Sequence, residues 1–164
     1  MRSRQLDAAG GCARVATKAT GLQRERDVAY WLLKSEPLKY SWDRLVADGT
    51  THWDGVRNFQ ASNNLKAMKT GDKAFFYHSN EGLEIVGIAE IAREYYPDPS
   101  DKSGRFGMVD VKPVRKLSKP VTLQQIKADQ RLADLALVRQ SRLSVLPVSE
   151  AHWRHICALG ETPA

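Results

Sequence analysis

Residues 73–93, K-A-F-F-Y-H-S-N-E-G-L-E-I-V-G-I-A-E-I-A-R, consist of two apolar stretches separated by a short polar turn. Residues 73–79 predict one strand, and residues 83–93 predict a second that is apolar through Ile91 and therefore partly buried on both faces. The connecting residues, Asn80-Glu81-Gly82, have the length and the final glycine of a β-hairpin loop. A parallel pair needs a much longer crossover, so this stretch predicts a hairpin at the centre of the fold.

Other strands are predicted on both sides of this hairpin. Residues 28–34 predict a buried strand, which Glu36-Pro37 ends because the residue before a proline is pushed into extended geometry. A third strand is predicted over residues 106–115, where apolar and polar residues alternate, and a last one over residues 144–148.

Helices are predicted from capping residues and apolar spacing. Ser41 is a suitable N-cap for a short helix through Ala47, which Asp48-Gly49 ends. A second helix is capped by Asn58 or Ser62 and buries one apolar face. Three more are predicted nearer the C-terminus: after the capping box of Thr122 and Gln125, over residues 131–138, and over residues 149–159 before Gly160.

Together these elements predict an α+β domain, a small curled mixed sheet or β-barrel with short peripheral helices. A doubly wound parallel sheet is disfavoured because the loops between the middle strands are too short for crossovers. The 164 residues are most simply one domain, long enough for a core without disulfides or metal. Residues 1–27 lack periodicity and predict a disordered basic leader, which places the folded domain at residues 28–164.

Composition narrows the class of protein. The chain has 25 Lys+Arg against 19 Asp+Glu, a net charge of +6, which suits a nucleic-acid-binding protein without establishing one. No apolar run approaches the length of a membrane span, so no membrane association is predicted. Cys12 and Cys157 lie at opposite ends of the sequence, which fits a reducing compartment. The expected location is the cytoplasm, or the nucleus in a eukaryote, and not the secreted fraction.

Four separated blocks of sequence carry a family resemblance. They are W-L-L-K-S-E-P at 31–37, W-D-G-V-R-N-F-Q-A-S-N-N-L at 53–65, F-F-Y-H-S at 75–79 and I-V-G-I-A-E-I at 85–91. In this order they resemble the EVE domain family, from about residue 29 to residue 159. The resemblance implies a PUA-like barrel, related to the YTH and ASCH domains. It also implies recognition of a modified base, such as a modified cytosine, in a pocket and without catalysis.

The implied partner is nucleic acid, with DNA carrying a modified base favoured and RNA as the alternative. No cofactor and no metal are expected, and the oligomeric state is left open. Carried over from the family motifs, the base pocket comprises Ser35, Trp53, Asn58, His78 and Ser79. A second tier consists of Glu36, Trp42, Asp54 and Tyr77, and the candidate phosphate contacts are Lys34, Lys39, Arg57, Arg139 and Arg142.

The chemistry of these residues is compatible with a base pocket. Everting a base costs a few kcal/mol, and stacking on an aromatic ring returns roughly 1–3 kcal/mol. Trp53 stands just before Gly55, where the backbone can turn sharply and present the indole at a rim. On this reading, Trp53→Ala abolishes binding of a modified oligonucleotide and leaves the fold largely intact.

Purely structural roles are open for the same residues. Tryptophan is usually a core residue, and Trp42 has Leu45 three positions later on the same helical face. Arg57 is also placed to pair with Asp54 instead of contacting phosphate. His78 and Ser79 are neighbours on a strand and point to opposite faces, so both enter one pocket only if the strand bulges.

Two other classes of function stay open. One is an ASCH-like hydrolase acting on nucleic acid through an acid such as Glu36, Asp43 or Asp54, although no complete catalytic constellation is visible. The other is a small-ligand or nucleotide-sensing domain. Product formation from an oligonucleotide identifies the hydrolase. Salt dependence separates both polymer-binding classes from the sensor, because a lone nucleoside releases almost no counterions.

Overall fold

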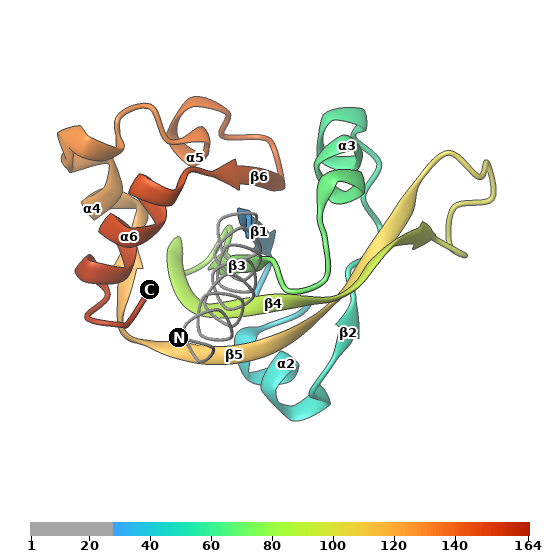
Figure 1. Ribbon diagram of the computed structural model, residues 1–164, viewed down its shortest axis with the longest axis horizontal. Helices are drawn as coiled ribbons and strands as arrows, with labels where there is room; N and C mark the ends of the chain where they lie inside the picture. The colour runs from blue at the N-terminus through green and yellow to red at the C-terminus, as the bar shows by residue number, and fades with distance from the viewer. Residues whose placement is uncertain (1–27) are drawn as a thin grey trace, which may run out of the picture.

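A six-stranded sheet in the order β2-β5-β4-β3-β1-β6 dominates residues 28–164, the part of the chain that the computed structural model describes (Figure 1). The strands are β1 (Tyr30–Ser35), β2 (Thr51–His52), β3 (Lys73–His78), β4 (Glu84–Pro97), β5 (Gly107–Thr122) and β6 (Val145–Val148). The predicted combination of a mixed sheet with short helices is confirmed. A closed barrel is not confirmed, because β2 and β6 are the two end strands of the sheet and are not paired with each other. The predicted leader, residues 1–27, lies outside the described residues.

The hairpin predicted from residues 73–93 is confirmed by the antiparallel pairing of β3 with β4. Its loop contains Asn80, Gly82 and Leu83 with positive φ angles of 67°, 84° and 45°. A register shift lies between Phe76 and Tyr77. β3 also pairs with β1, in parallel, so both strands finish at the same end of the sheet. The crossover that this parallel pair requires is supplied by the chain between them, which holds β2 and the helices on either side of it.

Caps predicted from the sequence define several helix boundaries. Ser41 accepts a hydrogen bond from the backbone N–H of Arg44 at the start of α2 (Trp42–Asp48), and Gly49 follows its end. Asn58, rather than Ser62, caps α3 (Phe59–Ala67). Thr122 forms the expected capping box before α4 (Leu123–Ala128), and α6 (Glu150–Leu159) ends the fold. No helix among residues 28–164 is long and apolar enough to cross a membrane.

The helix predicted over residues 131–138 is wrong. The structure has a short 3-10 turn, η1 (Gln130–Leu132), followed by a separate α5 (Ala136–Arg139). Leu132, Leu135 and Leu137 are all buried. Their spacing of three and then two residues cannot fall on one face of a continuous helix. The chain therefore breaks between them so that all three leucines reach the core.

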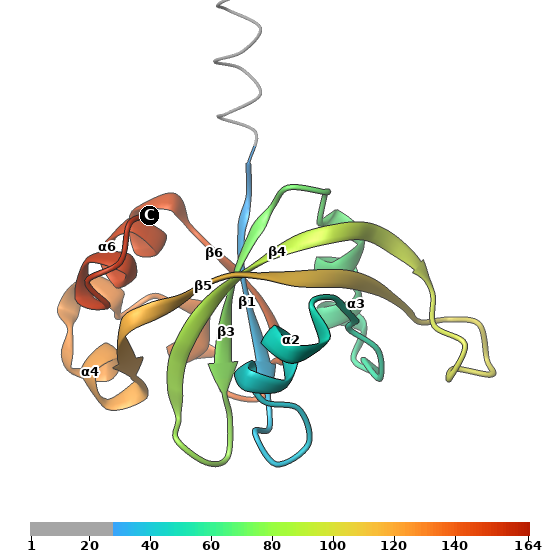
Figure 2. The same ribbon diagram turned by 90° about the horizontal axis from the view of Figure 1, so that it is seen from below.

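β4 and β5 are longer than predicted. They pair along most of their length, from Glu84 with Thr122 to Pro97 with Gly107, and they curve across the molecule as an extended arm (Figure 2). Trp42 of α2 packs against β4 at Gly87, where a Cβ atom would lie only 2.6 Å from the indole ring. The absence of a side chain at Gly87 is what lets α2 lie this close to the sheet.

Candidate functional site

A cavity of about 640 Å³ lies beside the last residues of β1, within the size range of small-ligand sites. Its wall combines segments that are distant in the sequence: the end of β1 and the following turn, residues 51–54, Ser79 after β3, and the segment 141–144 before β6. β1 and β3 run in parallel, and Ser35 is opposite His78 in the register. The fold thus gathers the W-L-L-K-S-E-P, W-D-G-V-R-N and F-F-Y-H-S blocks at one end of the sheet.

The structure brings together only part of the predicted set. Of the predicted base-pocket and phosphate-contact residues, those that line the cavity are Ser35, Glu36, Trp53, Asp54, Ser79, Lys34, Lys39 and Arg142. The others, which lie elsewhere on the described chain, are Asn58, Trp42, Tyr77, His78, Arg57 and Arg139. Asn58 is occupied as the N-cap of α3, where its side chain accepts from the N–H of Ala61 at 2.9 Å.

Trp53 belongs both to the core and to the cavity. In the interior, the Trp53 indole packs edge to face against the ring of Phe76, with 5.6 Å between the ring centroids. Its backbone N–H donates to the carbonyl of Val109 at 2.7 Å, which fixes the residue against β5. The residue is 9% exposed and lines the cavity. An indole held in this way is already ordered before any ligand arrives, so little rotamer freedom is lost on binding.

The two serines of the cavity wall are tied to the backbone around it. Ser35 donates its hydroxyl to the carbonyl of Tyr40 at 2.5 Å, and the N–H of Ser79 donates to the carbonyl of Ser35 at 2.9 Å. The Ser35 hydroxyl therefore stabilises the turn after β1 and retains only acceptor capacity for a ligand. Lys34 closes another part of the wall, donating from Nζ to the carbonyl of Ser141 at 2.7 Å.

His78, Trp42 and Tyr77 do not line the cavity and have structural surroundings instead. Trp42 and Tyr77 are 3% and 2% exposed and belong to the core. The Nε2 atom of His78 accepts a hydrogen bond from the backbone N–H of Trp42 at 3.1 Å, so His78 anchors the start of α2. Burial lowers the pKa of His78, against the opposing charges of Glu84 and Asp43.

This arrangement predicts a pH-dependent contribution of His78 to stability. Only the neutral imidazole accepts at Nε2, and the folded-state pKa lies below the ordinary value of about 6.5. The contribution is fully present above about pH 6.5 and is lost as the pH falls through the folded-state pKa. We expect His78→Gln to flatten this part of the profile of unfolding free energy against pH. Denaturant unfolding of the unmodified protein and of His78→Gln at about pH 7.5 and about pH 5 measures this contribution, and NMR titration follows the imidazole. Equal pH profiles for the two proteins would contradict the role of His78 as an acceptor.

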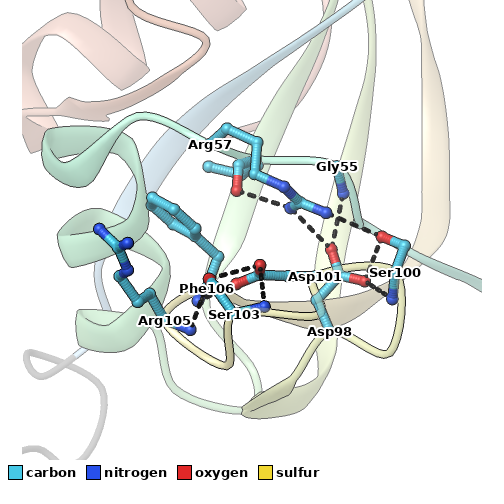
Figure 3. Close-up of polar contacts among 9 residues, drawn as sticks. Gly55, Arg57, Asp98, Ser100, Asp101, Ser103, Arg105 and Phe106 are labelled. Carbon is cyan, nitrogen blue, oxygen red and sulfur yellow. Dashed lines mark hydrogen bonds and ion pairs between the residues drawn. The ribbon is translucent and has the colours of Figure 1, made fainter.

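Arg57 is held by a buried carboxylate, and its partner is Asp98 rather than Asp54. Figure 3 shows the carboxylate of Asp98 facing Gly55, Arg57 and Ser100. The Arg57 Nη1–Asp98 Oδ2 distance is 3.1 Å, and the Asp98 side chain is 1% exposed. Burial by itself raises the pKa of Asp98, but the hydrogen bonds from Ser100, Gly55 and Arg57 outweigh burial and hold the pKa well below its usual range. The loop after Trp53 is thereby fastened to the loop between β4 and β5.

Sequence reasoning missed part of the cavity wall. Tyr40, Thr51 and His52 line it, as do Ser141 and Ser144 from the segment before β6. No motif marks that segment; a polar Q-S-R-L-S run at 140–144 is its only signal. Its place in the wall depends on β6 pairing with β1. That pairing joins residues more than a hundred positions apart, which local sequence patterns do not report.

The described fold is a mixed α/β domain of the type seen in YTH domains. A YTH domain from Zygosaccharomyces rouxii is similar in fold, with a TM-score of 0.53 at 18% identity over 82% of this chain and 87% of that one. Residues 29–159 match the EVE domain, and the chain belongs to the EVE domain family. Thymocyte nuclear protein 1 of Mus musculus is 38% identical over 167 residues, which cover 81% of this chain and 74% of the mouse protein.

Solved structures agree with this assignment. A protein from Rhodopseudomonas palustris is 57% identical, with a TM-score of 0.78 over 82% of this chain and 94% of that one. Human THYN1, solved in complex with DNA containing 5-methylcytosine, is 35% identical, with a TM-score of 0.76 over 83% of this chain and 99% of the human one.

Proposed function

We propose that this protein is a non-enzymatic reader of a modified base in DNA, and that the base enters the cavity beside Trp53. One observation carries the proposal: a cavity of about 640 Å³ combines a fixed indole with polar and basic groups. The human relative solved with DNA containing 5-methylcytosine supports a modified cytosine as the base. The place of action is then the compartment that holds the DNA, the nucleus in a eukaryote and the cytoplasm otherwise.

The groups around the cavity match the needs of an everted cytosine. The indole of Trp53 offers a stacking face, worth roughly 1–3 kcal/mol. Glu36 and Asp54 supply carboxylates able to accept from the exocyclic amino group of cytosine. Burying one methyl group is worth on the order of 0.8 kcal/mol, about a fourfold preference. Stronger discrimination requires a cavity shape that leaves a void or an unpaired polar group beside the wrong base.

The basic residues at the cavity supply the charge that DNA binding needs. Lys39 has a side chain that is 77% exposed, and Arg142 lines both this cavity and an adjoining one of about 340 Å³. Lys34 is partly buried, and burial lowers its pKa. We assign phosphate contact to Lys39 and Arg142 and wall support to Lys34. We do not assign phosphate contact to Arg57, which is paired with Asp98, or to Arg139, at the end of α5, because neither lines the cavity.

The proposal is tested by comparing affinities for oligonucleotides that differ only in one base. We expect DNA with 5-methylcytosine to bind more tightly than the same sequence with cytosine, thymine or N6-methyladenine, and to be recovered unchanged. Equal affinity for all bases would overturn base reading. Release of a product from the oligonucleotide would overturn the non-enzymatic assignment in favour of hydrolysis through Glu36 or Asp54.

Arg142→Gln is expected to weaken DNA binding uniformly across base modifications. Each neutralised phosphate contributes a slope of about 0.9 to the dependence of log affinity on log salt concentration, so losing one contact lowers the slope by about that amount. Fluorescence anisotropy between 50 and about 200 mM salt measures it. Arg139→Gln is the matched control, since Arg139 lies outside the cavity, and its slope should equal that of the unmodified protein. A changed base preference in Arg142→Gln would contradict a phosphate role.

A further inference from the structure

Leu38 is an unusually exposed apolar residue beside the cavity. Its exposed fraction is 82%, the largest among the exposed large hydrophobic residues of the described chain. Residues on both sides of it in the sequence, Glu36, Lys39 and Tyr40, line the cavity, while Leu38 itself does not. The leucine side chain therefore projects from the rim into solvent and not into the site.

The turn that carries Leu38 is fixed by several hydrogen bonds. The backbone N–H groups of Lys39 and Tyr40 donate to the carbonyl of Glu36 at 2.9 and 2.8 Å. The carbonyl of Tyr40 in turn accepts from the Ser35 hydroxyl at 2.5 Å, and Pro37 restricts the backbone. Leu38 is thus presented by a preorganised turn, which distinguishes it from an apolar residue on a mobile loop.

The surroundings of this turn suit a DNA backbone. Figure 2 shows the chain after β1 and the turn between β3 and β4 projecting from the same end of the sheet. Lys39, the residue after Leu38, has a side chain that is 77% exposed. Its ammonium group lies 3.6 Å from a carboxylate oxygen of Glu36. An exposed apolar tip therefore stands next to a cation, at the lip of a cavity able to hold a base.

We propose that Leu38 is a wedge that enters the base stack at the position vacated by the everted base, and that the preferred ligand is double-stranded DNA. The inference rests on the proposed function of the cavity. Eversion leaves a gap between two stacked base pairs, and DNA-binding proteins are able to insert apolar side chains between base steps. A leucine in the gap contacts both neighbouring pairs and excludes water, which offsets part of the free energy spent on unstacking. A flexible single strand has no such gap.

The test compares Leu38→Ala in duplex and single-stranded oligonucleotides carrying one 5-methylcytosine. We expect the duplex affinity to fall roughly tenfold, about 1.4 kcal/mol. Affinity for the single strand should be unchanged, because the cavity is intact. Leu38→Phe should keep the duplex affinity of the unmodified protein, since an aromatic ring also fills the gap. Val114→Ala, a second exposed apolar residue that does not line this cavity, is the control and should match the unmodified protein.

A 2-aminopurine placed next to the 5-methylcytosine gives a second readout. We expect its fluorescence to rise on binding, as its neighbour leaves the stack, and the size of the rise to differ between the unmodified protein and Leu38→Ala. Equal losses of affinity for duplex and single strand, or no loss for either, would overturn the wedge. If the unmodified protein shows no base preference, the proposed function fails; if the preference persists and Leu38→Ala binds normally, only the wedge fails.

Discussion

Trp53→Ala is expected to reduce affinity for DNA carrying the modified base by one to two orders of magnitude and to remove the base preference. The lost stacking, roughly 1–3 kcal/mol, accounts for the size of the effect. The structure also changes the expectation for stability. Because Trp53 is 9% exposed and packs on Phe76, we expect Trp53→Ala to lower the unfolding free energy by about 3 kcal/mol, rather than leave the fold untouched.

A leucine substitution separates the two effects. Trp53→Leu retains apolar volume against Phe76 but has no aromatic face for a base. Trp42→Leu is the matched control, because Trp42 packs on the same Phe76 ring, with 5.6 Å between centroids, and does not line the cavity. Fluorescence anisotropy and urea unfolding on both variants give binding and stability. Retained base preference in Trp53→Leu, or its loss in Trp42→Leu while the protein is folded, would contradict a stacking role.

Asp98→Asn is expected to lower the unfolding free energy at pH 7 by about 3 kcal/mol, because a nearly buried carboxylate accepts several hydrogen bonds and pairs with Arg57. The depressed pKa sets the pH dependence. The stabilisation is fully present above the ordinary pKa of about 3.9 and is lost as the pH falls through the lower folded-state value.

The difference between unmodified protein and Asp98→Asn should therefore be constant from pH 7 to about 5 and shrink in acid. Guanidinium unfolding across this range measures it. Asp54→Asn provides the control, since Asp54 is exposed, and its stability should stay close to that of the unmodified protein. A difference that grows in acid would mean that Asp98 does not carry the charge assigned to it.

Elements with local signals were predictable from the sequence. Ser41, Asn58 and Thr122 cap helices through contacts within three residues, and the loop between β3 and β4 needs only its own length and glycine. The long pairing of β4 with β5 and the break between η1 and α5 were not predictable. Both depend on tertiary contacts, the first on cross-strand partners such as Tyr96 and Met108, the second on burial of three leucines.

The candidate site shows the same division. The motif blocks identified Ser35, Trp53 and Ser79, which the fold brings to one cavity. His78 is the neighbour of Ser79, and strand geometry predicts that the two side chains diverge, as observed: Ser79 lines the cavity and His78 holds α2. Asp98, the partner of Arg57, and Ser141, which lines the wall, lie in segments that no pattern links to the motifs.

The outermost strands of the sheet limit how this protein can meet a partner. β2 has only Thr51 and His52, and β6 spans Val145–Val148 and includes Pro147, which has no N–H to donate. These two strands therefore offer few main-chain groups to an incoming chain, which disfavours strand addition at β2 and β6. At these two borders, recognition falls to the side chains and turns where the strands finish.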